Sequence, residues 1–122
     1  MTADLSALIA RLEAGPVYLT HKEAYDLAIL FGSDTALGMA SLIRKAFTGG
    51  SLDAALALVE RVLGGWAWQV DRWGAMSRIT LNECDNDGWH RSKHQRIEVA
   101  IELPPALALC IAILRAKQGE GE

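Results

Sequence analysis

The sequence predicts an α+β fold in which a small antiparallel sheet of about three strands is packed with about five helices. Up to Leu63, apolar residues recur at the three- and four-residue spacing of helices. After Gly64-Gly65 the spacing changes to the alternation typical of strands, and Pro104-Pro105 then introduces a last apolar helix. We expect a single domain over residues 1–118 and a disordered tail over 119–122, where the sequence is GEGE.

Four helices are expected before the glycine pair, and the residues that begin and end them support this. Gly15-Pro16 ends the first helix. Thr20 and Glu23 form a capping-box pattern that begins the second. Ser51 is a suitable N-cap for the fourth, which Gly64-Gly65 ends. We place these helices near residues 2–14, 20–31, 34–47 and 51–63.

Three strands are expected near 66–73, 75–83 and 95–103, and a last helix near 105–117. Trp66, Trp68 and Val70 fall on one face of the first strand, which we expect to lie in the core beneath the helices. Trp73 falls on the other face, which favours an exposed or interface position. The third strand, QRIEVAIEL, alternates most clearly, as in a sheet with one solvated face.

The last helix is apolar nearly all round, since residues 106–114 form an unbroken apolar run. Such a helix must be covered on more than one side. Upstream helices can supply that cover, or a second copy of the protein can cover Leu109 or Ile113. The limited surface of a small sheet favours the second copy, and we therefore expect a homo-oligomer.

Composition excludes several functional classes. The 122 residues are 51% hydrophobic and 22% charged, with a net charge of −3, so no basic footprint predicts binding to duplex nucleic acid. The first segment carries Asp4, Arg11 and Glu13 within its apolar pattern, unlike a signal peptide or a membrane span. We therefore expect a cytoplasmic protein without membrane contact, in which Cys84 and Cys110 are free thiols.

One segment resembles a metal site. In CDNDGWHRSKH, the three-residue gap between His90 and His94 falls within the zinc-finger range, and Cys84 could supply a thiolate, but no second cysteine lies close by. Asp85 and Asp87 resemble the first half of a calcium loop, yet His94 stands where the bidentate glutamate belongs. We expect polar surface here, and neither a metal nor a cofactor.

Catalytic patterns are otherwise missing from the sequence. It has no phosphate-binding glycine loop and no nucleophile elbow. His21 lies inside the predicted capping box, where an exposed histidine is ordinary. We therefore expect that the protein is not an enzyme.

Two segments carry a resemblance to a known family. SLDAALALVERVLGGWAWQVDRWG (51–74) and PPALALCIAILRAK (104–117) resemble small uncharacterised phage and prophage proteins of alphaproteobacteria. The opening DLSALIARLEA is similar to the starts of those proteins. The layout is similar to the phage ABA-sandwich domain, in which a small sheet is packed with helices. The resemblance rests on core-forming residues and implies no activity and no site residue.

Two functional hypotheses follow. The first is a non-enzymatic, phage-derived interaction or assembly module that binds itself, or a host or phage protein, through the final helix and the aromatic strand edge. The second is a protein that binds or sequesters a small ligand such as a nucleotide. In that hypothesis an indole stacks on the base while arginines contact phosphate; the residues concerned are Trp73, Trp89, Arg72, Arg78 and Arg91. For these basic residues we favour the simpler explanation, an ordinary solvated sheet face.

Overall fold

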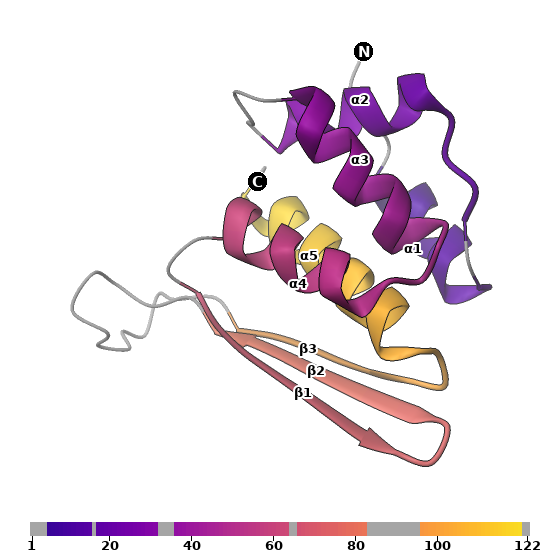
Figure 1. Ribbon diagram of the computed structural model, residues 1–122. Helices are drawn as coiled ribbons and strands as arrows, with labels where there is room; N and C mark the ends of the chain where they lie inside the picture. Colours follow the sequence, from indigo (N-terminus) through magenta and orange to yellow (C-terminus); the bar gives the residue numbers. More distant parts are fainter. Residues whose placement is uncertain (1–4, 16, 32–35, 64–65, 83–95, 121–122) are drawn as a thin grey trace.

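The α+β fold class is confirmed by a computed structural model, which describes residues 5–15, 17–31, 36–63, 66–82 and 96–120 (Figure 1). The elements follow the predicted order, and their bounds differ from the predicted ones by three residues at most. They are α1 (Leu5–Glu13), α2 (His21–Leu30), α3 (Ala36–Phe47), α4 (Leu52–Val62), β1 (Ala67–Trp73), β2 (Met76–Asn82), β3 (Arg96–Ile101) and α5 (Pro105–Glu120).

The three strands form one antiparallel sheet in the order β1-β2-β3, so β1 and β3 are its edges. Val70 pairs with Ile79, which pairs with Val99. The two-residue loop between β1 and β2 begins at Gly74, whose φ of +57° suits the first position of a tight hairpin turn.

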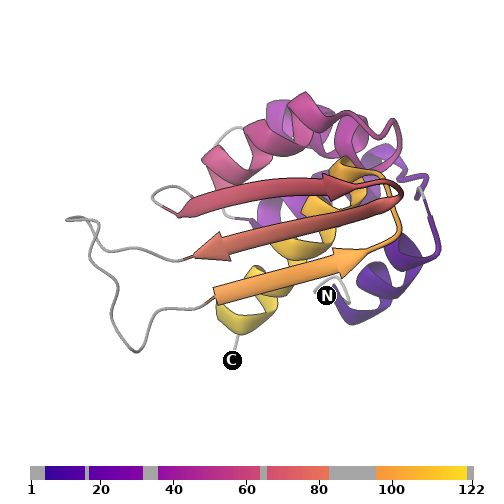
Figure 2. The same cartoon turned by 90° about the horizontal axis from the view of Figure 1, so that it is seen from below.

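One face of the sheet is covered by helices and the other is open (Figure 2). Ser77, Ile79 and Leu81 of β2 are buried on the covered face, as the alternation predicts. Arg78 lies on the open face. Thr80 also lies there, yet it is only 7% exposed because Gln69 and Glu98 flank it on the neighbouring strands. The predicted one-sided solvation of the sheet is therefore confirmed.

Only one of the two tryptophans that we expected in the core packs against it. Trp66 packs against the core, but Trp68 is 43% exposed although it shares the covered face with Leu81. The cause is the position of α5, which lies over β2 and β3 and reaches the edge strand β1 less. Assigning Trp68 to the core was wrong for this reason, whereas Trp73 is exposed as predicted, at 58%.

Helix α5 forms the centre of the molecule (Figure 1). The sheet lies on one side of it, and α1, α3 and α4 contact it on others. Leu109 and Ile113 are fully buried within a single chain, so the upstream helices supply the cover that this apolar helix requires. The argument for a second copy at α5 therefore loses its basis. Cys110 is also buried here, and burial raises the pKa of its thiol.

The end of α5 lies further along the chain than expected. The helix runs to Glu120, so Gly119 and Glu120 belong to it and not to a tail, while 121–122 lie outside the described residues. Contacts with α1 hold this last part of the helix: Arg115 Nη2 lies 3.3 Å from Glu13 Oε2, and Gln118 Nε2 donates to Ser6 Oγ at 2.6 Å. A polar sequence stays helical here because α1 provides partners.

Candidate functional site

Besides Leu52 at the start of α4, two parts of the described surface expose large apolar side chains. One is the edge strand β1, with Trp68 and Trp73, and the other surrounds α2, with Tyr18, Tyr25 and Ile29. Exposed aromatic groups are enriched where proteins bind partners and ligands. The β1 edge and the α2 surface are therefore the two candidate sites.

The β1 edge presents unpaired backbone groups. Trp73 and Met76 flank the two-residue loop, so this pair exchanges hydrogen bonds, and the exchange repeats at every second residue along the ladder. Ala67, Gln69 and Asp71 therefore direct their N–H and C=O groups toward β2. The backbone groups of Trp68, Val70 and Arg72 point outward, away from the sheet.

The helix layer is wider than the three strands beneath it. Neighbouring strands lie about 4.8 Å apart and packed helices about 8–10 Å apart, so two helices cover roughly four strands. Here α5 lies over β2 and β3, and α4 packs beside α5 and extends past β1 in Figure 2. Part of the helix layer therefore lies beyond the edge of the sheet at β1, where Trp68 is 43% exposed.

The residues of the nucleotide hypothesis do not converge on one surface. Trp73 and Arg78 share the open face of the sheet, but Arg72 has the opposite parity and its Nε donates to Gly74 O at 3.1 Å. Trp89 and Arg91 lie outside the described residues.

Arg78 is already engaged in an ion pair. Its Nη2 lies 2.7 Å from Glu98 Oε2, and Arg96 lies 3.6 Å from the same oxygen. The hydrogen bond from Arg78 holds the pKa of the Glu98 carboxyl below its usual value. A phosphate bound to Arg78 would compete with this carboxylate, so the open face offers a poor anion site.

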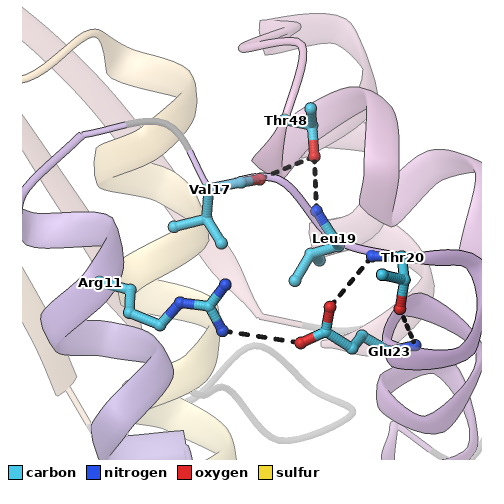
Figure 3. A network of polar contacts seen from close by, with 6 residues as sticks. All are labelled: Arg11, Val17, Leu19, Thr20, Glu23 and Thr48. Atoms are coloured by element: carbon cyan, nitrogen blue, oxygen red, sulfur yellow. Dashed lines mark hydrogen bonds and ion pairs between the residues drawn. The ribbon is translucent and has the colours of Figure 1, made fainter.

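The α2 surface is shaped by polar contacts that fix the segment between α1 and α2 (Figure 3). Thr48 Oγ1 donates to Val17 O at 2.7 Å and accepts from Leu19 N at 3.2 Å. The predicted capping box is confirmed, because Glu23 N donates to Thr20 Oγ1 and Thr20 N to Glu23 Oε1, both at 3.1 Å. These contacts hold the start of α2 against the end of α3.

The Glu23 carboxylate is turned toward α1. Arg11 Nη1 lies 3.7 Å from Glu23 Oε2, on the side shown in Figure 3. The pKa of Glu23 lies below its usual value, chiefly because the Thr20 N–H donates to it. Glu23 is therefore ionised and committed to the helix cap and to Arg11.

Thr48→Val should cost about 1–2 kcal/mol of folding free energy. Valine has nearly the same shape but leaves the buried Leu19 N–H and the Val17 carbonyl without the Thr48 hydroxyl. Chemical denaturation measures the loss, and Thr48→Ser, which keeps the hydroxyl, is the control. Equal losses in the two variants would show that the hydrogen bonds contribute little.

A groove of about 700 Å³ lies between α2 and α3. Its described lining is His21, Lys22, Tyr25, Ala40, Ser41, Arg44, Lys45, Thr48 and Gly49. Three of these side chains are cationic at neutral pH and none is acidic. Arg44 is positioned by its Nε, which donates to Leu19 O at 3.2 Å. Its Nη1 lies 3.2 and 3.0 Å from the two ring nitrogens of His21.

Sequence reasoning did not find this groove. His21 was expected to be an ordinary first-turn residue, and the pairs His21-Lys22 and Arg44-Lys45 lie more than twenty residues apart. The only signal in the sequence is that one basic pair begins a predicted helix and the other lies near the end of the next. If such helices pack antiparallel, the two pairs come together.

The structure bears on the metal and membrane expectations only within the residues that it describes. Within the described ranges, no group of three or more His, Cys, Asp or Glu side chains is arranged to hold a metal. Cys84, His90 and His94 lie in 83–95, outside those ranges. Among the described helices, none combines the length and apolar character that a membrane crossing requires.

Comparison with known proteins gives no relative: no family model, no curated protein and no solved structure matches this chain.

Proposed function

We propose that the protein is a non-enzymatic interaction module that binds an extended segment of a partner as an added strand on β1. The observation that carries this proposal is the outward-facing backbone of β1 at the point where α4 extends beyond the sheet. An edge strand of this kind binds through main-chain hydrogen bonds, while alternate side chains provide specificity.

The side chains around the edge indicate what the partner segment should contain. On the covered face, Trp68 and Val70 offer apolar contacts, and Arg72 lies at the end of the row. On the open face, Gln69 and Asp71 are joined by a hydrogen bond of 3.0 Å. A fitting segment has apolar residues at alternate positions, with an acidic residue opposite Arg72.

The geometry favours such a segment over a second folded copy. Two β1 strands paired antiparallel in one continuous sheet would have their helix layers on the same face, which would bring each α4 over the partner's β1, into the layer that the partner's own α4 occupies. A single extended segment meets no such conflict. This supports an assembly role with a host or phage protein, and the phage origin and cytoplasmic location expected from the sequence belong to the same proposal. The homo-oligomer becomes an outcome to be tested.

Selection of short peptides from a display library against the immobilised protein tests this proposal. We expect enriched peptides to alternate in apolar residues and to protect the amides of Trp68, Val70 and Arg72 from hydrogen exchange. Val70→Pro removes one outward amide without removing a β1–β2 hydrogen bond, so it should weaken binding about ten-fold or more. Arg72→Pro, nearer the strand end, is the second variant if the first loses its fold.

Three results would contradict the proposal. They are enrichment of peptides without alternation, protection of β3 in place of β1, and equal binding by the wild type and both proline variants. Light scattering coupled to size exclusion measures whether the protein forms a dimer in solution. A stable dimer of the wild type that Val70→Pro dissociates would replace the partner segment with a second copy of this chain.

A further inference from the structure

The groove between α2 and α3 concentrates positive charge in a chain that is acidic as a whole. Lys22, Arg44 and Lys45 line it together, whereas the whole chain has a net charge of −3. Among the described residues, none of these three cations forms an ion pair with a carboxylate. The nearest acidic residue in sequence, Glu23, is committed to Arg11 and to the cap of α2. Within the part of the chain that the structure describes, no carboxylate therefore balances the positive charge of the groove.

Backbone dipoles do not cancel the positive charge of the groove. The groove lies between the start of α2 and the end of α3, whose partial charges have opposite signs and about equal size. Carbonyls at the end of α3 are also occupied: Arg44 O accepts from Thr48 N and Gly49 N, and Lys45 O accepts from Ser51 N. Side-chain charge therefore decides which ligand the groove attracts.

Arg44 is held in place before any ligand arrives. Its Nε is bound to Leu19 O, and Leu19 is in turn fixed by Thr48. A guanidinium held in this way loses little conformational freedom when it binds. Since Nε donates to Leu19 O and Nη1 contacts His21, Nη2 is the nitrogen best placed to donate to a phosphate oxygen. Lys22 and Lys45, both exposed, add mobile point charges on either side.

The groove also has an apolar wall and a suitable size. Tyr25 lines it and is 40% exposed, which leaves an aromatic face for a planar group. A volume of about 700 Å³ falls within the range of small-molecule sites. We propose that this groove binds a phosphate-bearing small molecule, with Arg44, Lys22 and Lys45 on the phosphate and Tyr25 against a planar part of the ligand.

This site differs from the one that the sequence suggested for a nucleotide. None of its cations was among the predicted ligand residues, and it lies on the helices, whereas Arg72, Trp73 and Arg78 lie on the sheet. It also does not depend on the β1 edge, so either proposal can fail alone.

Calorimetric titration with inorganic phosphate, adenosine and AMP tests the assignment. We expect AMP to bind most tightly, phosphate more weakly, and adenosine not measurably. Lys45→Glu and Lys22→Glu should each weaken AMP binding about ten-fold or more. Arg61→Glu, which makes the same charge change at an exposed position on α4, is the matched control and should leave the affinity unchanged. Circular dichroism confirms that each variant is folded.

Tyr25→Ala separates the two sources of a phosphate group. If it weakens AMP but not inorganic phosphate, the ligand is a phosphate ester with a planar group. If phosphate and AMP bind equally and Tyr25→Ala affects neither, the groove still binds phosphate but takes the free ion. Two results would overturn the proposal: no binding of phosphate or AMP at millimolar concentration, or an equal loss in Lys45→Glu and Arg61→Glu.

Discussion

Ile113→Glu is expected to abolish the folded state, with a loss above about 4 kcal/mol. Ile113 is fully buried on α5, which is enclosed by the sheet and by α1, α3 and α4. A carboxylate there would be removed from water without a partner. Circular dichroism and the dispersion of amide resonances should both report an unfolded or molten chain.

Ile113→Val is the matched control for this substitution. It removes one methylene group at the same place and should cost only about 0.5–1.5 kcal/mol. A different result is expected if a second copy of the protein covers α5. A folded Ile113→Glu variant that retains its helix content and dissociates a wild-type multimer would place this residue at an interface.

Trp66→Ala is expected to cost about 3 kcal/mol, more than the same change at Trp68 or Trp73 of β1. Trp66 is partly buried and packs against the core, so its truncation leaves a cavity. Trp68→Ala and Trp73→Ala should cost less folding free energy, because these side chains are already 43% and 58% exposed. Their exposures differ by roughly 40 Å², so their losses should differ by no more than about 1 kcal/mol.

Chemical denaturation of the three alanine variants measures this order. From the sequence alone, Trp68→Ala is expected to cost much more folding free energy than Trp73→Ala, since the two residues lie on opposite faces of one strand. The structure predicts a smaller difference between the two losses, because α5 leaves β1 partly uncovered. If Trp68→Ala costs as much as Trp66→Ala, α4 covers the β1 edge more closely than its described position implies.

Local patterns predicted most of the fold because they depend on neighbouring residues. The Thr20–Glu23 capping box and the Ser51 cap begin α2 and α4 as expected. The alternation in QRIEVAIEL also assigned the two faces of the sheet correctly, since Val99 is buried and Glu98 is exposed. Each of these signals arises within a few positions of the element that it specifies.

The features that the sequence did not reveal depend on how elements pack. Exposure of Trp68 follows from the sideways position of α5, which no residue near Trp68 encodes. The basic groove requires His21 and Arg44 to meet across two helices, and contacts of Thr48 with Val17 and Leu19 fix that arrangement. Periodicity describes one element at a time and therefore cannot place such pairs.

The central position of α5 also has a consequence for protein synthesis. A ribosome makes α5 after every element that packs against it, because α1, α4 and the sheet all precede it in the chain. Until α5 leaves the exit tunnel, the apolar faces of those elements have no common partner. The core is therefore completed only after α5 emerges, and until then the nascent chain is held only by local structure such as the helix caps and the β1–β2 hairpin.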